Sequence, residues 1–245
     1  MTDVIPPPAR VAARGALLLD FDGTLVPIAP RPDEVQLPPG LVALLQRLYR
    51  RLDGALAIVT GRDLETLDDL LAPLVLPAAG EHGLVLRPTA DRAAEFAARH
   101  ALPEFLRIAG QALMQAHPGT VLEVKRAGIA LHYRAVPEAA GSLLGAMRAL
   151  AAMHTGHELL RGHMLLEIRP RGIHKGTAVR ALMRAHPFAG RTPVFVGDDF
   201  TDEDGIAASL ALGGHGMRMA ETFRTPERLG EWLHRIAEVR DDAAA

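Results

Sequence analysis

Two aspartates follow an apolar run near the start of the chain. The stretch ALLLDFDGTLVPI, residues 16–28, begins like a buried strand and then carries Asp20 and Asp22 one residue apart. Carboxylates at the end of a buried run cost free energy unless something compensates them. One interpretation is a strand end and a turn, with Asp22-Gly23 as turn residues. The other is a metal or catalytic site, because open α/β sheets place their chemistry at the carboxyl ends of parallel strands.

Polar residues also mark the ends of other apolar runs. Thr60 ends the run ALAIVT, and Asp198 and Asp199 end the run within TPVFVGDDF. Lys175 stands at the start of a helical pattern, HKGTAVRALMRAH. Because the carboxyl ends of parallel strands meet at one edge of a sheet, that edge would collect carboxylates, a hydroxyl and an ammonium group.

Each of these residues also has an ordinary structural interpretation. Thr60 can cap the helix that follows it. Lys175 can be a solvated helix-start residue, although a cation there opposes the helix dipole. The segment DDFTDED, residues 198–204, can be an acidic helix start, which the dipole favours. The four features together favour a reactive site over these separate explanations.

The collected groups are suited to phosphoryl transfer. Neighbouring carboxylates repel one another and need a hard divalent cation, which beside a phosphate is most often Mg²⁺. One aspartate can attack phosphorus and form an aspartyl-phosphate, while a second carboxyl protonates the leaving oxygen and later activates water. A lysine supplies a point charge, and backbone N–H groups of the DGT segment at residues 22–24 can hold phosphoryl oxygens.

The elements that must position these residues alternate between strands and helices at both ends of the chain. Apolar runs predict strands, and a 3.6-residue periodicity predicts helices between them, as in LVALLQRLYRRL and LETLDDLL. This βαβαβ order indicates a parallel sheet with right-handed crossovers. A closing helix is predicted over TPERLGEWLHRIAEV, with Thr225 as N-cap and Pro226 at the first helical position. We expect a loop in GGHGMRM (213–219) and frayed tails in IPPPAR and DDAAA.

The middle of the chain has a different pattern. RAAEFAARH (92–100), EFLRIAGQALMQAH and PEAAGSLLGAMRALAAMH are predicted to be helical. Hairpins are predicted about Arg126-Ala127-Gly128 and about Gly162-His163. Hairpins between helices indicate an α+β unit with an antiparallel sheet. We therefore expect residues 1–86 and 168–245 to form an α/β domain into which residues 87–167 are inserted.

Composition excludes several classes of function. The chain has 245 residues, of which 49% are hydrophobic, and a net charge of -2, so it has no basic field for nucleic acid. Cysteine is absent, which excludes disulfides and thiol catalysis. No signal-peptide pattern and no run of about 20 apolar residues is present, so we expect a cytoplasmic protein without membrane contact. Of the 27 basic residues only Lys125 and Lys175 are lysine, which suggests positions that need a compact ammonium group.

Four segments of the chain resemble, in order and spacing, the four motifs of the haloacid dehalogenase-like (HAD) phosphatases. They are DFDGTL, TGR, the single Lys175 and GDDFTDED. The resemblance implies a Rossmann-like parallel-sheet core with an inserted α+β cap domain, and Mg²⁺ as cofactor. It implies the following roles: Asp20 as nucleophile and metal ligand; Asp22 as general acid/base that also touches the metal through its carbonyl; Thr60 and Lys175 as phosphoryl-binding residues; Asp198 as a direct metal ligand; and Asp199 or Asp202 as outer-shell helpers.

The inserted unit carries alternating charged residues. Glu123 and Lys125 lie two apart in one predicted strand, and Glu167 and Arg169 lie two apart in another, so each pair shares a sheet face. Carboxylates that accept and an ammonium that donates hydrogen bonds suit a hydroxyl-rich ligand. Cross-strand salt bridges on a solvated sheet face explain the same pattern. The pattern alone leaves both interpretations open.

Three further segments resemble the signatures of the trehalose-6-phosphate phosphatases. They are GEHG (80–83), LEVKRAGIALHYR and EIRPRGIHKG. That resemblance implies that Glu123, Lys125 and Glu167 bind the second glucose, with Arg169, Glu81 and His82 nearby, and that Gly23 contributes to phosphate binding. It implies Mg²⁺-dependent hydrolysis of trehalose 6-phosphate by an enzyme that we expect to be monomeric. The alternatives are a phosphatase for a sucrose phosphate or a mannosyl-glycerate phosphate, and a sugar-phosphate-binding regulator without catalysis.

Overall fold

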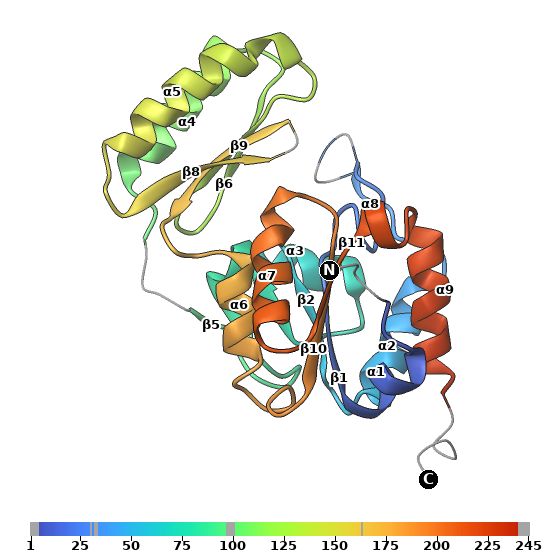
Figure 1. Ribbon diagram of the computed structural model, residues 1–245. Helices are drawn as coiled ribbons and strands as arrows, with labels where there is room; N and C mark the ends of the chain where they lie inside the picture. The colour runs from blue at the N-terminus through green and yellow to red at the C-terminus, as the bar shows by residue number, and fades with distance from the viewer. Residues whose placement is uncertain (1–4, 30, 32–33, 97–100, 163, 240–245) are drawn as a thin grey trace. The chain divides into compact units, whose positions relative to one another are not determined.

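The computed structural model describes residues 5–29, 31, 34–96, 101–162 and 164–239. The chain divides into two compact units (Figure 1). The first unit combines the two ends of the chain, Met1–Ala97 and His174–Ala245, and the second unit is Ala98–Ile173. No described helix is long and apolar enough to cross a membrane.

The first unit is built on a sheet of seven described strands in the order β11-β10-β1-β2-β3-β4-β5. The strands are β1 Gly15–Leu19, β2 Leu56–Val59, β3 Ala78–Gly80, β4 Val85–Arg87, β5 Glu95–Phe96, β10 Thr192–Gly197 and β11 His215–Arg218. β11, β10, β1, β2 and β3 pair in parallel, and β4 and β5 extend the sheet with antiparallel pairs. This Rossmann-like order confirms the predicted α/β core.

The central strands are apolar along their whole length. Every residue of β1 and β2 is buried, as are the last five residues of β10. A parallel strand is covered by helices on both faces, so its sequence reads as a continuous apolar run and not as an alternating one. For this reason the polar residues of these segments stand after the strands, where the sheet ends.

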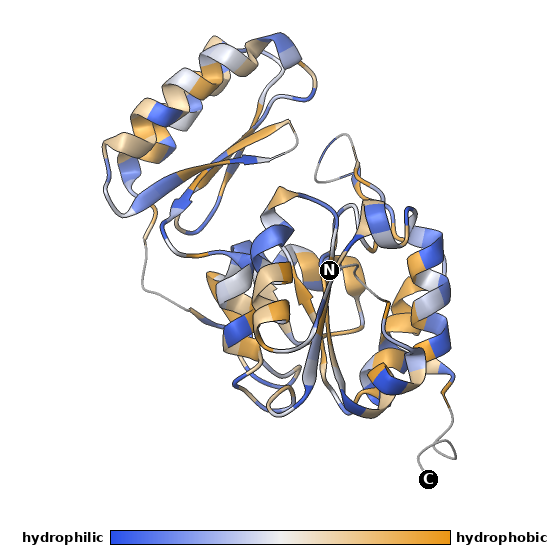
Figure 2. Ribbon diagram, in the orientation of Figure 1, coloured by the Kyte–Doolittle hydropathy of each residue, from blue (hydrophilic) through white to orange (hydrophobic). Residues whose placement is uncertain are grey.

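The helices of the first unit are α1 Pro8–Arg14, α2 Leu41–Arg51, α3 Leu64–Leu71, α6 Lys175–Leu182, α7 Glu203–Ala211, α8 Met219–Thr222 and α9 Pro226–Ala237, with short 3₁₀ turns η2 Glu81–Gly83 and η4 Phe200–Asp202. Of these, α2 and α9 have a clearly apolar side (Figure 2). α9 begins as predicted: the Thr225 side chain accepts a hydrogen bond from the Arg228 N–H, and Pro226 occupies the first turn.

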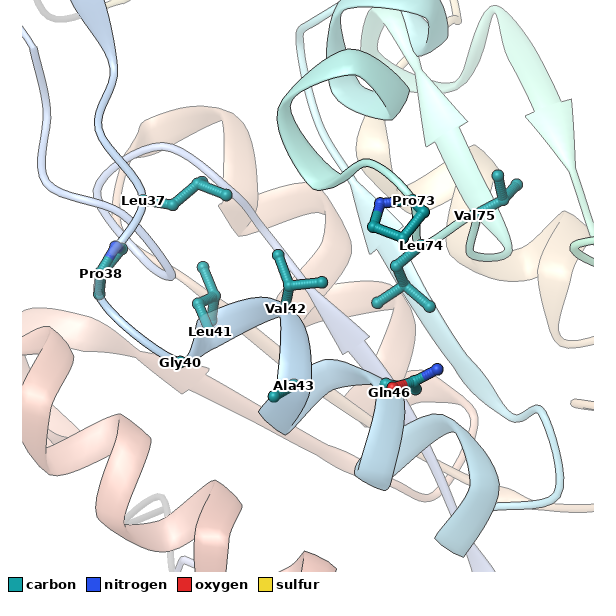
Figure 3. A pocket seen from close by; sticks show the side chains of 10 residues that line it. All are labelled: Leu37, Pro38, Gly40, Leu41, Val42, Ala43, Gln46, Pro73, Leu74 and Val75. Atoms are coloured by element: carbon teal, nitrogen blue, oxygen red, sulfur yellow. The ribbon is translucent and has the colours of Figure 1, made fainter.

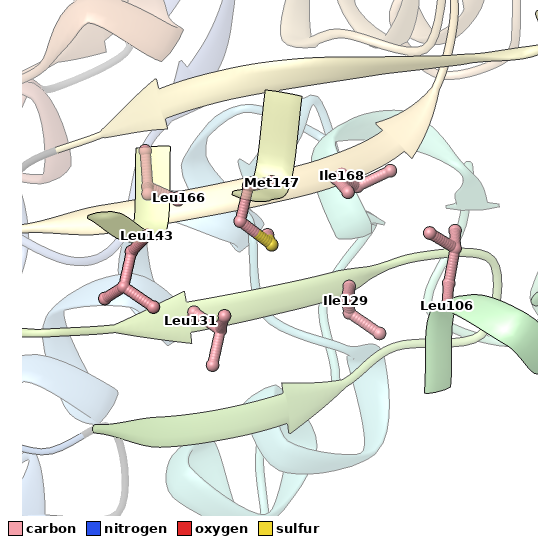
Figure 4. Close-up of a cluster of buried hydrophobic side chains, with 7 residues drawn as sticks. All are labelled: Leu106, Ile129, Leu131, Leu143, Met147, Leu166 and Ile168. Carbon is pink, nitrogen blue, oxygen red and sulfur yellow. The ribbon is translucent and has the colours of Figure 1, made fainter. Parts of the chain in front are cut away.

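The second unit is a four-stranded antiparallel sheet with helices packed on it. The strands are β6 Val121–Val124, β7 Ile129–His132, β8 His157–Gly162 and β9 Leu165–Pro170, in the order β6-β7-β9-β8, and the helices are α4 Glu104–Ala116 and α5 Ala140–Ala152, preceded by η3 Pro137–Ala139. Figure 4 shows its core, in which helix residues such as Leu106, Leu143 and Met147 meet Ile129 and Ile168 of the strands. The predicted α+β character is confirmed.

Three predicted segments differ in the structure. RAAEFAARH is not a helix where it is described, because Glu95 and Phe96 form edge strand β5 against β4. GGHGMRM is not a loop: β11 gains its backbone hydrogen bonds from β10, and a Cβ at Gly216 would lie 2.6 Å from Ile206. IPPPAR is not a frayed tail where it is described. Helix α1 starts within it at Pro8, and the Trp232 indole donates a hydrogen bond to the Pro6 carbonyl. His163 and the DDAAA tail lie outside the described residues.

The boundaries between the units also lie later in the chain than predicted. β4 and β5 extend the sheet of the first unit past residue 87, and β9 continues the sheet of the second unit to Pro170. Strand pairing therefore moves the two boundaries to residues 97/98 and 173/174.

Candidate active site

The carboxyl ends of three neighbouring strands bring the first set of polar residues together. β1 pairs with β10 on one side and with β2 on the other. Asp20, Asp198 and Thr60 follow directly after these strands, so they lie at one edge of the sheet, as the sequence predicted.

Lys175 links two aspartates from different parts of the first unit. Its Nζ donates to Asp20 Oδ1 and to Asp202 Oδ1, each at 2.6 Å, and the lysine is 3% exposed. Burial lowers the pKa of Lys175, but the charges of Asp20 and Asp202 outweigh it, so the pKa lies above its ordinary value. Lys175 is therefore a fixed ammonium and not a solvated helix-start residue.

Three carboxylates form a group that could hold a metal ion. Oxygen atoms of Asp20, Asp198 and Asp202 all lie within 4.8 Å of one another. Burial, together with repulsion from neighbouring carboxylates, raises the pKa of each of the three to about 7, despite the opposing charge of Lys175. One ammonium does not balance three carboxylates, and hard oxygen ligands at this spacing suit a divalent cation.

Asp20 is held at both of its oxygens. Lys175 occupies Oδ1, and the Thr24 hydroxyl donates to Oδ2 at 3.0 Å. The Asp20 residue is 3% exposed, so its carboxylate has a defined orientation in a largely dry site. Sequence reasoning missed the role of Thr24, although this threonine belongs to the DGT segment.

Gly23 contributes space at this site. Its φ is +81°, and a Cβ there would lie 2.0 Å from Asp198 Oδ2, so any other residue would be strained and would displace that carboxylate. The Gly23 N–H donates to the Val26 carbonyl at 2.8 Å. In this structure the Gly23 N–H is occupied within the loop, and phosphate binding by the DGT segment stays a prediction.

Asp199 and Asp202 have different surroundings. Asp202 is fully buried, and its Oδ2 accepts hydrogen bonds from the backbone N–H groups of Asp198 and Asp199. It thereby orients the Asp198 loop and anchors Lys175. Asp199 lies outside the three-carboxylate group and caps η4 by accepting two hydrogen bonds from Thr201. Burial raises the pKa of Asp199, but the Lys175 charge and the Thr201 bonds outweigh it, so this pKa is lowered.

Asp22 lies apart from the three-carboxylate group and pairs with an arginine. Arg62 donates to both Asp22 oxygens, from Nε and from one terminal nitrogen, each at 2.7 Å. The Asp22 side chain is 35% exposed, whereas that of Arg62 is 11% exposed. Arg62 was not predicted as a site residue, although it is the arginine of the TGR motif.

Thr60 lies next to a strained turn. Its hydroxyl accepts a hydrogen bond from the Arg62 N–H at 3.1 Å and can still donate its own proton. The Thr60 carbonyl accepts from the His82 N–H. Glu81 and His82 have φ angles of 48° and 59°, which are unusual for residues other than glycine and are concentrated at functional sites. Both residues are buried, and they lie beside Thr60, which the sequence predicts to bind the phosphoryl group.

The second unit carries its own charged cluster, on one face of its sheet. Lys125 Nζ lies 2.9 Å from Glu167 and 3.9 Å from Glu123, and His132 lies 2.9 Å from the other oxygen of Glu123. The side chains of Lys125 and Glu167 are 8% and 2% exposed, so this ion pair is buried, whereas Glu123 and His132 are partly exposed. Burial raises the pKa of Glu123, but Lys125 and His132 outweigh it and lower this pKa.

Arg169 completes the same strand face. It is buried, and its Nε donates to Glu158 of the neighbouring strand at 3.2 Å. His132 was not predicted as a site residue, although it is the histidine of the quoted HYR segment.

A cavity elsewhere in the first unit has a volume of about 560 Å³ (Figure 3). Leu37, Leu41, Pro73 and Leu74 are among the residues that line it. None of its described lining residues belongs to the predicted site, so the candidate site depends on the polar clusters and not on this apolar hollow.

Comparisons with known proteins identify the family of the chain. The family model for trehalose-phosphatase matches residues 18–222. The chain is 36% identical over 219 residues to the trehalose-6-phosphate phosphatase of Escherichia coli, which covers 89% of this chain and 82% of the relative. It is 40% identical over 216 residues to the probable trehalose-phosphate phosphatase of Sinorhizobium fredii, covering 88% of this chain and 81% of the relative.

Solved structures support the fold. The C-terminal domain of the Candida albicans trehalose-6-phosphate phosphatase superposes with a TM-score of 0.79 at 19% identity and covers 98% of this chain and 100% of that one. A haloacid dehalogenase-like hydrolase from Bacteroides thetaiotaomicron superposes with a TM-score of 0.61 at 14% identity and covers 91% of this chain and 99% of that one. With the family match and the relatives above 30% identity, the chain belongs to the trehalose-phosphatase family.

Proposed function

We propose that this protein hydrolyses trehalose 6-phosphate to trehalose and phosphate through an aspartyl-phosphate on Asp20, with Mg²⁺ as cofactor. The observation that carries the proposal is the buried Asp20 carboxylate, whose two oxygens are oriented by Lys175 and Thr24 beside Asp198. Family membership supports the substrate, since the curated relatives are named for this activity.

The three-carboxylate group fits the cation. Asp20 and Asp198 would hold it, with Asp202 next to them. Bound Mg²⁺ would offset the surplus negative charge and polarise the phosphoryl oxygens.

The protein's own residues account for the proton transfers. In the first step an Asp20 oxygen bonds to phosphorus, the ester bond to the sugar breaks, and Asp22 gives its proton to the leaving sugar oxygen. In the second step water bonds to phosphorus, its proton passes to Asp22, and the acyl-phosphate bond breaks to regenerate the Asp20 carboxylate. The Thr60 hydroxyl and the Lys175 ammonium hold phosphoryl oxygens throughout.

The charged cluster of the second unit is proposed to bind the sugar. Glu123 and Glu167 accept hydrogen bonds from sugar hydroxyls, and Lys125 donates to a sugar oxygen. Mutual ion pairing holds these side chains in place before the substrate arrives, which reduces the entropy lost on binding. His132 orients the cluster through Glu123, and Arg169 pairs with Glu158 of the neighbouring strand.

A phosphate-release assay on a panel of sugar phosphates tests the proposal. Trehalose 6-phosphate, a sucrose phosphate, a mannosyl-glycerate phosphate and glucose 6-phosphate are compared with Mg²⁺ present and with EDTA. We expect the highest kcat/KM for trehalose 6-phosphate and no activity in EDTA. A higher kcat/KM for another sugar phosphate would contradict the proposed substrate, and the absence of phosphate release from every ester would contradict catalysis.

A further inference from the structure

Arg62 lies between two proposed catalytic groups. It follows Thr60 by two residues at the end of β2, and its backbone N–H donates to the Thr60 hydroxyl. Its backbone carbonyl accepts from the Glu81 N–H at 2.8 Å. The backbone of Arg62 is therefore tied on both sides to the loops that follow β2 and β3.

The Arg62 side chain extends to the loop that follows β1. Its guanidinium lies 5.9 Å from the centre of the Phe21 ring, and it donates two hydrogen bonds of 2.7 Å to the two oxygens of Asp22. A bidentate pair fixes the plane and direction of a carboxylate, which a single contact does not. The Asp22 side chain is 35% exposed, whereas Asp20 and Asp202 are buried, so without this fork the short Asp22 side chain would rotate between staggered rotamers.

We propose that Arg62 is a positioning residue for Asp22 in the reaction. It holds the acid/base carboxyl at a fixed place relative to the Thr60 hydroxyl, and hence relative to the phosphoryl group that this hydroxyl binds. One of the two contacts can hold the carboxyl while the other oxygen passes its proton to the leaving sugar oxygen, and later takes one from water. This inference depends on the proposed roles of Asp22 and Thr60.

The first unit contains a matched control pair. Arg87 donates two hydrogen bonds of 2.6 Å to the two oxygens of Asp68. The side chains of Arg87 and Asp68 are 8% and 31% exposed, close to the values for Arg62 and Asp22. The hydrogen bonds described for the Arg87 side chain go to Asp68 and to the Leu76 carbonyl, and none of these partners is a proposed catalytic group. Arg87→Ala therefore removes an equivalent ion pair without affecting Asp22.

The experiment measures kcat/KM for a series of phosphate monoesters, from aryl esters with good leaving groups to alkyl esters with poor ones. kcat/KM reports the step that forms the aspartyl-phosphate, and protonation by Asp22 matters more as the leaving group becomes poorer. The variants are Arg62→Ala, Arg62→Lys, Asp22→Asn, the double variant of Arg62→Ala with Asp22→Asn, and Arg87→Ala. The series does not require trehalose 6-phosphate, so it remains informative if the proposed substrate is wrong.

For Arg62→Ala we expect kcat/KM to fall about ten- to hundredfold for alkyl esters and less than about threefold for the best aryl ester. The loss on alkyl esters is a part of the whole contribution of a general acid, which is roughly 10²–10⁴-fold. The double variant should match Asp22→Asn alone, and Arg87→Ala should keep the wild-type dependence on the leaving group. Arg62→Lys, which cannot bind both oxygens, should show a partial loss with the same trend and replaces Arg62→Ala if that variant does not fold. An equal loss on all esters, or multiplication of the two single losses in the double variant, would overturn the proposal.

Discussion

The two lysines of this chain each lie among carboxylates, but their surroundings differ. In the first unit, Lys175 contacts Asp20 and Asp202 at 2.6 Å, with Asp198 as a third carboxylate nearby. In the second unit, Lys125 lies 2.9 Å from Glu167 and 3.9 Å from Glu123. Both ammonium groups are buried, which is tolerated only when such charges are paired.

The difference lies in the balance of charge. Around Lys175 the carboxylates outnumber the cation, and burial with mutual repulsion raises the pKa of Asp20, Asp198 and Asp202 to about 7. Around Lys125 only two carboxylates share one ammonium group, and Lys125 and His132 lower the pKa of Glu123 despite its burial. Three carboxylates around one ammonium suit a site that binds a cation and attacks phosphorus, whereas the smaller charge surplus around Lys125 suits neutral sugar hydroxyls.

The largest effect is expected for Asp20→Asn. An amide cannot attack phosphorus, so turnover should fall by about a thousandfold or more. The measurement is phosphate release from trehalose 6-phosphate and from an aryl phosphate, with mass spectrometry to exclude deamidation. Asp53→Asn, which removes a largely exposed carboxylate paired with Arg191, serves as the control. Turnover at a few per cent of wild type or more would contradict Asp20 as the nucleophile.

Removal of the cation should also abolish activity, because the surplus charge around Lys175 then has no counter-ion. Wild-type protein in excess EDTA should be inactive and should recover when Mg²⁺ is restored. Asp198→Ala should lose activity on every substrate, and added Mg²⁺ should restore little of it, since a ligand is missing. Full activity of the wild-type protein in excess chelator would show that the Lys175 cluster needs no cation for catalysis.

A smaller and selective effect is expected in the cluster around Lys125. Lys125→Ala and Glu167→Gln should lower kcat/KM for trehalose 6-phosphate about ten- to hundredfold, since a hydrogen bond to a charged group contributes about 1.5–3 kcal/mol. Hydrolysis of a small aryl phosphate should stay within about threefold of wild type, because that ester has no sugar to bind.

Glu104→Gln, which alters an exposed pair with Arg107 on α4, is the control for these variants. Equal losses on the sugar phosphate and on the aryl phosphate would contradict a sugar-binding role for the cluster.

The smallest effect concerns stability without the cation. A carboxyl with a pKa of about 7 in the folded protein and about 4 in the unfolded chain takes up protons on folding. The free energy of unfolding should therefore fall as the pH rises from about 4 to about 7. The full shift corresponds to about 4 kcal/mol for one carboxyl, and solvent screening of the partly exposed Asp198 reduces its share to about 1–2 kcal/mol. Denaturant unfolding in EDTA at pH 5 and at pH 7.5 measures this change.

Asp198→Asn should weaken this pH dependence, and Mg²⁺ should restore the stability of the wild-type protein at pH 7.5. If the free energy of unfolding in EDTA changed with pH in the same way for the wild-type protein and for Asp198→Asn, the raised pKa of Asp198 would not be the cause of the pH dependence.

The sequence by itself determined the elements with strong local patterns. The buried strands before Asp20, Thr60 and Asp198 were predictable because parallel strands covered on both faces read as continuous apolar runs. The helix over residues 64–71 and the Thr225 cap followed from periodicity and from capping chemistry within a few residues. Since strand ends meet at one edge, these patterns also placed Asp20, Thr60 and Asp198 near one another before any contact was known.

Only the tertiary structure decided the remaining features. β5 and β11 are short edge strands whose segments resemble a helix and a loop, and they become strands because β4 and β10 supply their hydrogen bonds. The pairing of Arg62 with Asp22 joins residues 40 positions apart, and that of Lys125 with Glu167 joins residues 42 positions apart. Local periodicity records which face of an element is buried, but the partner of a polar side chain depends on which loops the folded chain brings within about 3 Å of one another.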